Sequence, residues 1–503
     1  MPKQLNSWLE VLDGWLAADA YSTAWVAMVP DIHDISQPAW PQALEYLRAH
    51  QLVDGGWGEP KVFYAHERTL STLAAIKALH LWNLPEDRPR IQRGIEALHY
   101  YADCFQDEPY ESIGFELLLP RLTADLEAIS EQLPLDRWAP VQRKYEQKLA
   151  LIRQLQPQPG QHQSWWFSLE MLLEDSLQQL DDSILGPNGS IATASAPTAA
   201  YLRARRLAGS DSPRAAAWLA HLVDRQGGGV PFCWPAEVFE RVWAMDSFMR
   251  AGIDPRTPFI QQIAKSIWEA WHRGEPGLSS SEFFSVNDGD DTLVGFTVLN
   301  WAGYQPDEAP VLRFWNGGHF KSYLDERNAS ITVNIHGLHA LRSQPDFLHR
   351  DKAHQITNLL RAELMAVSPF ADKWHISPYY ALAHAIQAVL GWDDALARNC
   401  VESLVEEQHL DGGWGWRGQS TLEETAHVVL ALSQAYEYGI FKNPAVFVKI
   451  AGFLQSHSDH NRERLWIGKT LYRPEGLVEA LLYSASYRLE QLGFGSVYQQ
   501  KAV

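Results

Sequence analysis

Three carboxylates stand close together at Asp288, Asp290 and Asp291, in the stretch Asp288-Gly-Asp-Asp291. Carboxylates this close cannot all ionise cheaply, so one of them is expected to hold its proton at neutral pH. In a dry pocket a held proton is a strong acid, able to protonate a base as weak as a carbon–carbon double bond. A simpler interpretation also fits, because acidic residues commonly cap the start of a helix.

A helical pattern begins directly after the three carboxylates. Leu293, Phe296 and Leu299 fall on one face of a helix, and Gly303 stands where that helix would end. The spacing therefore places Asp290 and Asp291 in the N-cap region, where backbone N–H groups and the helix dipole stabilise negative charge.

Helical patterns also dominate the rest of the chain, and no convincing run of alternating strand residues appears. Helices are predicted over 67–82, 237–249, 378–390 and 425–438. The motif Gln-x-x-Asp-Gly-Gly-Trp-Gly occurs at 51–58 and again at 408–415, in each case after a helix-like segment. Internal repetition of this kind indicates stacked helical units. The sequence thus predicts an all-α protein, and paired helices joined by Gly-rich turns suggest α/α barrels.

Composition excludes several classes of protein. A net charge of -19 over 503 residues argues against partners such as nucleic acid and anionic membrane surfaces. The 21 tryptophans could fill a large helical core, or line a cavity for a long apolar ligand or a cation. The three cysteines show no metal or disulfide spacing, which favours a reducing cytoplasm. No signal sequence or bilayer-spanning run is seen, so stable membrane insertion is not expected.

Several stretches together resemble the class II diterpene cyclases, the copalyl diphosphate synthase group. They occur in family order, and Ser22 replaces an Asp of the family pattern in the first of them. In addition to Asp288-Gly-Asp-Asp291, the matching stretches are Ala20-Tyr-Ser-Thr-Ala-Trp-Val-Ala27, Ala65-His-Glu-Arg-Thr-Leu-Ser-Thr-Leu-Ala74, Ile113-Gly-Phe-Glu116, Ser168-Leu-Glu170, Trp234-Pro-Ala-Glu-Val-Phe-Glu-Arg-Val-Trp243 and Trp466-Ile-Gly-Lys-Thr-Leu-Tyr-Arg473.

The resemblance implies two α/α-barrel domains, called β and γ, with the active site at their interface. Residues 1–19 would form the first helix of the β domain and residues 20–232 the inserted γ domain. Residues 233–503 would complete the β domain, which carries the acid motif. A Gly- and Pro-rich stretch at 227–235 marks the expected junction.

The resemblance also implies a reaction. Asp290 corresponds to the family's general acid, with Asp288 and Asp291 as supporting carboxylates. The implied step is protonation of the terminal alkene of geranylgeranyl diphosphate, followed by ring closure through carbocations, with the diphosphate retained. The high aromatic content agrees, since cations need a water-free cavity and ring faces rather than nucleophiles.

At the diphosphate end the resemblance implies bound Mg²⁺. Asp107, Glu108 and Glu111 occupy the place of the family's acidic metal-linked motif, although the alignment there needs a small gap. Oxygen ligands suit Mg²⁺, but a solvated acidic loop is an alternative interpretation. Residues that match family substrate-binding positions are Lys148, Lys373 and the adjacent Trp374. For Lys469, in Trp466-Ile-Gly-Lys469, two roles are open: contact with the substrate phosphates, or a bridge between helices.

One departure from the family concerns the end of the reaction. Enzymes of the ent-copalyl series hold a His and an Asn where this chain has Phe167 and Phe232, and neither Phe can accept a proton or orient a water. Two ring faces would prolong the cation and allow hydride and methyl shifts. That favours a rearranged product of the halimadienyl or kolavenyl (clerodane) type over copalyl diphosphate, unless another base does the same work.

Other functions stay open at this stage. A copalyl diphosphate synthase and a drimenyl-type sesquiterpene cyclase share the chemistry, while a squalene–hopene-type cyclase would normally be longer and dip into the membrane. A non-enzymatic α/α-barrel binding protein is the alternative from another class, but it has no need of a clustered, partly protonated acid. Beyond the substrate, a homodimer is compatible with the sequence, and a downstream terpene synthase or transferase is expected to act on the diphosphate product.

Overall fold

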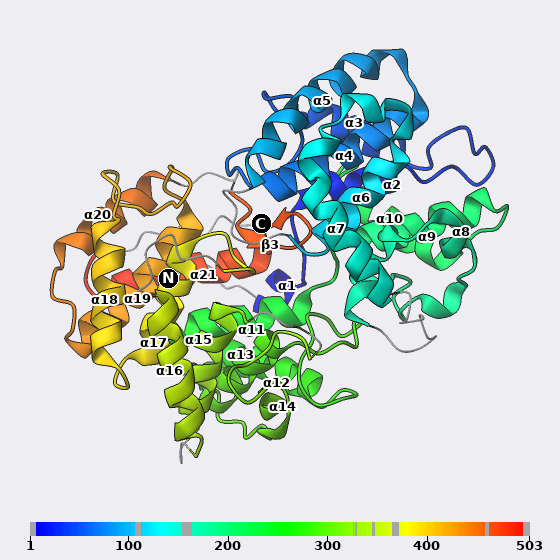
Figure 1. The fold of residues 1–503 in the computed structure, drawn as a ribbon. Helices are drawn as coiled ribbons and strands as arrows, with labels where there is room; N and C mark the ends of the chain where they lie inside the picture. Colours follow the sequence, from blue (N-terminus) through cyan, green and yellow to red (C-terminus); the bar gives the residue numbers. More distant parts are fainter. Residues whose placement is uncertain are drawn as a thin grey trace. The chain divides into compact units, whose positions relative to one another are not determined.

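The computed structural model describes residues 7–105, 112–152, 163–324, 326, 329–344, 348–364, 372–457 and 462–495. The chain folds into two compact units (Figure 1). Unit 1 consists of Met1–Trp15, Ala236–Arg462 and Pro474–Val503. Unit 2 consists of Leu16–Pro235 and Glu463–Arg473.

Unit 1 is an α/α barrel whose inner helices form a closed ring. Each inner helix contacts the next one in the chain, and the last returns to the first. In chain order the inner helices are α11 (Glu237–Arg250), α13 (Gly289–Trp301), α15 (Ile331–Arg342), α17 (Pro378–Val389), α19 (Leu422–Tyr438) and α21 (Glu475–Gln491). The outer helices are α1 (Trp8–Val11), α12 (Pro258–Trp271), α14 (Ala309–Leu312), α16 (Arg350–Leu364), α18 (Asp394–Glu406) and α20 (Ala445–Ser456).

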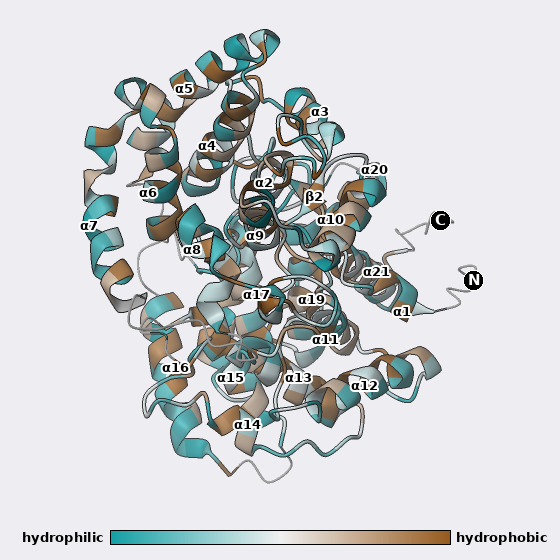
Figure 2. Ribbon diagram, turned by 90° about the vertical axis from the view of Figure 1, so that its right-hand side faces the viewer, coloured by the Kyte–Doolittle hydropathy of each residue, from teal (hydrophilic) through white to brown (hydrophobic). Residues whose placement is uncertain are grey.

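The two layers differ in how their side chains are buried. The outer helix α12 buries Ile260, Ile263, Ile267 and Trp271, a single stripe at helical spacing, and Figure 2 shows both hydrophilic and hydrophobic residues along it. The inner helix α13 is buried around most of its circumference. A helix surrounded by protein in this way can carry polar side chains only where they find partners.

Unit 2 repeats the two-layer plan. Its inner ring joins α2 (Ala20–Ala27), α4 (Ala65–Trp82), α6 (Phe115–Asp125), the 3₁₀ segment η4 (Ser164–Met171) and α9 (Ser195–Leu207), which contacts α2 again. The outer elements are α3 (Pro41–Ala49), α5 (Arg88–Asp103), α7 (Leu135–Ile152), α8 (Glu174–Gln178) and α10 (Pro213–Arg225), with short 3₁₀ segments η1 (Pro85–Asp87), η3 (Glu127–Gln132) and η5 (Asp182–Ile184).

Two-residue strands complete unit 2. Strand β1 (Ala18–Asp19) pairs antiparallel with β2 (Val230–Pro231). Strand β3 (Trp466–Ile467) pairs antiparallel with β4 (Leu471–Tyr472). Among the described residues these are the longest strands, so the predicted all-α class with α/α barrels is confirmed.

The repeated Gln/Trp motif builds the same turn once in each unit. The indole N–H of Trp57 donates to the Leu47 carbonyl at 2.7 Å, and that of Trp414 donates to the Leu404 carbonyl at 2.7 Å. Both indoles are fully buried. The backbone N–H of Trp57 also donates to Thr72 on α4, and that of Trp414 to Thr425 on α19, so each motif ties the C-terminal end of one outer helix, α3 or α18, to the next inner helix.

Two expectations at the domain boundaries need correction. Of the predicted first helix over 1–19, the described residues 7–19 contain a helix at Trp8–Val11 and no longer one. The chain turns at Gly14, where φ is +79° and a Cβ would lie 2.4 Å from the Ala236 nitrogen, and residues 18–19 join unit 2 as a strand. The segment Glu463–Arg473, which the sequence analysis assigned to 233–503, also belongs to unit 2. The predicted junction near 232 and 233 lies close to the observed change of unit after Pro235.

The other sequence expectations for helices agree with the structure. The predicted helices 67–82, 237–249, 378–390 and 425–438 correspond to α4, α11, α17 and α19 within a few residues. None of the helices in the described ranges combines the length and the apolar character that a membrane crossing requires.

Candidate active site

The three clustered carboxylates stand at the first turn of α13 in unit 1. Asp288 is the N-cap residue, and its Oδ1 accepts the backbone N–H of Asp291 at 2.8 Å. Gly289 is required for this turn, because a Cβ there would lie 2.1 Å from the Lys321 carbonyl oxygen. Asp290 and Asp291 therefore lie in the first turn of the helix, two and three residues after the N-cap, within the N-cap region that the sequence analysis gave them.

The three carboxyl groups differ in burial. Asp288 and Asp291 are buried, whereas the Asp290 side chain keeps 15% of its surface exposed. Burial, with the Asp291 charge next, raises the pKa of Asp288 well above its usual range. Burial also raises the pKa of Asp291 to about 7, against the hydrogen bonds that it makes with Asp288 and Trp243. The cluster thus retains protons near neutral pH, and Asp290 is its most accessible member.

Asp290 has a hydrogen-bond partner that sequence reasoning missed. Nδ1 of His336, on α15, lies 2.6 Å from Asp290 Oδ1. The indole N–H of Trp243, on α11, donates to Asp291 Oδ1 at 3.2 Å, and its ring lies edge-on to the His336 ring at 4.8 Å. The available signal was a histidine on a helix that buries most of its residues, polar ones included.

Lys373 and Trp374 lie beside the start of the same helix. The Trp374 indole donates to the Ser322 hydroxyl at 3.1 Å, and the Ser322 carbonyl accepts the Gly289 N–H at 2.7 Å. The Lys373 ammonium forms an ion pair with Glu326 and lies 5.5 Å from the Trp374 ring centre. The structure therefore brings these two predicted substrate-binding residues to the acid motif.

In unit 2, Phe167 and Phe232 form an edge-to-face pair with ring centres 5.0 Å apart. The Lys469 ammonium lies 5.6 Å from one ring centre and 5.9 Å from the other. Lys469 also forms a buried ion pair with Glu170 at 2.6 Å. Because the Tyr21 hydroxyl also donates to Glu170 at 2.9 Å, side chains from three separate matching stretches meet at this corner.

The predicted diphosphate end is described only in part. Lys148, on α7, forms an ion pair with Glu116 at the start of α6. The three carboxylates expected to bind Mg²⁺ lie outside the described residues; they are Asp107, Glu108 and Glu111. Just beyond them, the backbone N–H of Ile113 donates to the Gly468 carbonyl at 2.9 Å. That bond joins the residues after the acidic stretch to the hairpin that carries Lys469.

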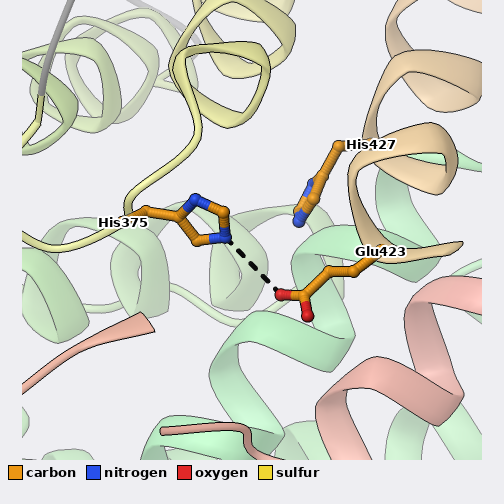
Figure 3. Close-up of side chains that lie close together, drawn as sticks. All are labelled: His375, Glu423 and His427. Carbon is orange, nitrogen blue, oxygen red and sulfur yellow. Dashed lines mark ion pairs between the residues drawn. The ribbon is translucent and has the colours of Figure 1, made fainter. Parts of the chain in front are cut away.

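A second cluster in unit 1 has the composition of a metal site. His375, Glu423 and His427 converge, with potential ligand atoms within 4.8 Å of one another (Figure 3). The donor pattern does not suit a cation, however. The Ser377 N–H donates to His375 Nδ1 at 3.1 Å, and an Arg250 N–H faces His427 Nδ1 at 3.5 Å. A ring nitrogen that accepts leaves the proton on the other, so both Nε2 atoms carry hydrogens and cannot also ligate a metal.

Comparisons with known proteins give one consistent family. No protein-family model matches the chain. A type B diterpene cyclase of Mycobacterium tuberculosis is 31% identical over 496 residues, which cover 94% of this chain and 96% of the relative. A copalyl diphosphate synthase of Streptomyces anulatus is 28% identical, covering 90% of this chain and 85% of the relative.

Plant relatives are longer than this chain. A (-)-kolavenyl diphosphate synthase of Tripterygium wilfordii is 29% identical over 73% of this chain, but the match spans only 44% of that protein. Among solved structures, ent-copalyl diphosphate synthase from Streptomyces platensis superposes with a TM-score of 0.76 at 24% identity, covering 96% of this chain and 98% of the other. The last comparison shows the shared fold.

The extent of the match to the mycobacterial relative decides the family. That relative exceeds 30% identity over nearly the whole of both chains. The chain is an enzyme of the isomerase type, and it belongs to the class II diterpene cyclase family.

Proposed function

We propose that this enzyme converts geranylgeranyl diphosphate into a bicyclic diterpenyl diphosphate, with Asp290 as the general acid. The Asp290 O–H bond breaks as a new C–H bond forms at the terminal alkene. This leaves a carboxylate on the enzyme and a carbocation on the substrate. Neighbouring alkenes then attack the cation in turn to close the rings. Loss of a proton from a carbon next to the final cation to a base forms a new double bond and gives the neutral product, and the diphosphate stays attached throughout.

The observation that carries the proposal is the arrangement around Asp290. Its two neighbouring carboxyl groups are buried, while its own side chain is partly accessible and has Nδ1 of His336 2.6 Å from its Oδ1. A donor aimed at a carboxyl oxygen stabilises the negative charge that develops there as the proton leaves. A binding protein without chemistry has no use for this arrangement.

Two lysines and three carboxylates are proposed for the diphosphate end of the substrate. Lys148 in unit 2 forms an ion pair with Glu116, and Lys373 in unit 1 forms an ion pair with Glu326, so a diphosphate bound by either lysine would have to share it with that carboxylate or displace the carboxylate. We propose that Asp107, Glu108 and Glu111 hold Mg²⁺ there, because carboxylate oxygens are suitable ligands and Mg²⁺ is commonly bound through substrate phosphates. In this role the ion would offset the negative charge of the diphosphate.

For the product we propose a rearranged skeleton, of the kolavenyl or halimadienyl type. The supporting observation is the Phe167–Phe232 pair, which presents aromatic rings instead of a base. The positive charge of the nearby Lys469 ammonium is neutralised by its ion pair with Glu170. The Lys469–Glu170 pair therefore adds no net charge that would repel a substrate carbocation. Copalyl diphosphate is the alternative product if a base elsewhere ends the reaction sooner.

The test is an incubation of the enzyme with geranylgeranyl diphosphate and Mg²⁺, followed by dephosphorylation, mass spectrometry and NMR of the product. A parallel incubation with the C15 diphosphate separates this function from a drimenyl-type cyclase. Binding of either substrate without turnover would favour a binding protein.

The variant that tests Asp290 as the general acid is Asp290→Asn. Asparagine keeps an oxygen that accepts the His336 N–H, so the fold is expected to survive, but an amide cannot supply the proton. General acid catalysis contributes about 10²–10⁴-fold, and a loss of that size is expected. Asp393→Asn, at the N-cap of the outer helix α18, is the control and should retain activity. Turnover of Asp290→Asn within tenfold of the wild type would overturn the assignment.

A further inference from the structure

A row of buried side chains extends from Asp290 across the interior of unit 1. His336 Nδ1 lies 2.6 Å from Asp290, and His336 Nε2 lies 3.1 Å from Nδ1 of His384 on α17. His384 Nε2 in turn lies 2.9 Å from Nη1 of Arg250 on α11. Four inner helices of the barrel therefore contribute one residue each to a continuous line of hydrogen bonds.

The direction of every hydrogen bond in this row is determined at the Arg250 end. A guanidinium only donates, so the Nε2 atom of His384 must accept and its proton must lie on Nδ1. That N–H then donates to His336 Nε2, which places the His336 proton on Nδ1, facing Asp290. Reversing any one bond would leave two hydrogens or two lone pairs facing each other in the row.

Burial protects these hydrogen bonds from competition with water. Arg250, His336 and His384 are all buried. Burial, and then the Arg250 charge, lowers the pKa of His384 well below its usual range, so its ring stays neutral and can accept on one side while it donates on the other. Asp246 on α11 lies 3.8 Å from the guanidinium and 3.9 Å from His384 Nδ1, where its charge favours a hydrogen on that nitrogen.

We propose that Arg250 is a positioning residue for the acid: acting through His384, it fixes the His336 tautomer so that an N–H always faces Asp290. This inference rests on the proposed function of Asp290. Without the row, His336 could carry its proton on Nε2 and present a lone pair to the carboxylate that forms when the proton leaves. That carboxylate would then lose its main stabilising donor.

The first measurement uses the wild-type enzyme without substrate. Nitrogen NMR of ¹⁵N-histidine-labelled enzyme distinguishes the two neutral tautomers, and difference spectra of His336→Gln and His384→Gln assign the two rings. Both rings are expected to carry hydrogen on Nδ1. An Nε2–H tautomer at either ring overturns the proposal, and this result does not depend on whether any variant folds.

The second measurement breaks and restores the row. His384→Leu removes the link, so His336 should become a mixture of tautomers and kcat should fall about ten- to hundredfold, as for loss of a hydrogen bond to a charged group, with KM unchanged. His384→Gln can accept from Arg250 and donate to His336, and it should recover most of the activity. His339→Gln, one turn further along α15 and outside the row, is the matched control and should behave as wild type.

The outcomes separate the positioning role from the proposed function. A folded His384→Leu enzyme with wild-type kcat, or one whose His336 keeps its hydrogen on Nδ1, refutes the role of the row. A wild-type enzyme that leaves geranylgeranyl diphosphate unchanged overturns the proposed function, and with it the catalytic meaning of the row, whichever tautomers the spectrum shows.

Discussion

Replacing Lys469 by methionine tests how much the buried Lys469–Glu170 ion pair stabilises the part of unit 2 where Tyr21, Glu170 and Lys469 meet. The Lys469 ammonium lies 2.6 Å from Glu170 Oε1, and both side chains are at most 1% exposed. The variant removes the cation but keeps a side chain of similar length. Glu170 would then remain buried with the Tyr21 hydroxyl, which donates to the same oxygen at 2.9 Å.

The size of the effect follows from this burial. Removing one partner of a buried ion pair typically costs about 3–5 kcal/mol, because the other charge stays in a medium that solvates it poorly. Burial is also the largest influence on Lys469 itself, whose pKa it lowers, while Glu170 opposes that shift. Replacing both charges, in Lys469→Met with Glu170→Leu, removes the stranded charge. The double variant is therefore expected near the stability of the wild type.

Native-state hydrogen exchange of peptides covering 463–473 and α2 measures the local opening free energy without assuming that both units unfold together. At tenfold per 1.4 kcal/mol, exchange in Lys469→Met should be faster by about two to three and a half orders of magnitude. Lys265→Met, which breaks an exposed i,i+4 pair with Glu269, is the control and should not change exchange measurably. Exchange of Lys469→Met within tenfold of the wild type, or a double variant as unstable as the single one, would refute the reasoning.

Three further predictions concern the reaction. Lys148→Ala and Lys373→Ala should mainly raise KM, and EDTA should abolish activity that Mg²⁺ restores; steady-state kinetics unchanged by all three treatments would contradict the diphosphate placement. Burial raises the pKa of Asp291 to about 7, so the carboxylate cluster keeps the Asp291 proton below pH 7 and loses it above. We therefore expect kcat/KM to fall about tenfold per pH unit above pH 7, and a flat profile to pH 9 would count against a proton held on Asp291. Phe167→His with Phe232→Asn should shift the product toward copalyl diphosphate or a hydroxylated relative in mass spectra, and a wild type that already makes copalyl diphosphate would show the interpretation of the two rings to be wrong.

Local patterns predicted much of the fold. Helix spacing located α4, α11, α17 and α19, and the repeated Gln/Trp motif indicated the pairing of outer and inner helices in both units. These features depend on residues near one another in the chain. The first segment shows what cannot be predicted without long-range contacts. The family resemblance implied a helix to residue 19, but the close approach of Gly14 to Ala236 turns the chain earlier.

The candidate site was predictable only where its residues form motifs. The carboxylates of α13 stand side by side in the sequence, and Lys373 and Trp374 were located by resemblance. His336, His384 and Arg250 belong to no motif, and the contacts that join them to Asp290 and to one another span 46, 48 and 134 residues. Each alone looks like an ordinary polar residue of a helix. Only the closure of the barrel shows that their side chains meet.

The row behind Asp290 also bears on why polar groups persist inside such a barrel. Replacing a buried charged network by well-packed apolar side chains is often neutral for stability or even favourable. Stability therefore does not explain why Arg250 and Asp246 are buried on an inner helix of the barrel. A reaction that creates a carboxylate in a dry cavity does supply a reason, because the donor that meets the new charge must already point at it before the proton leaves. A histidine alone could present either an N–H or a lone pair to Asp290, whereas a histidine joined through His384 to a buried guanidinium presents only the N–H.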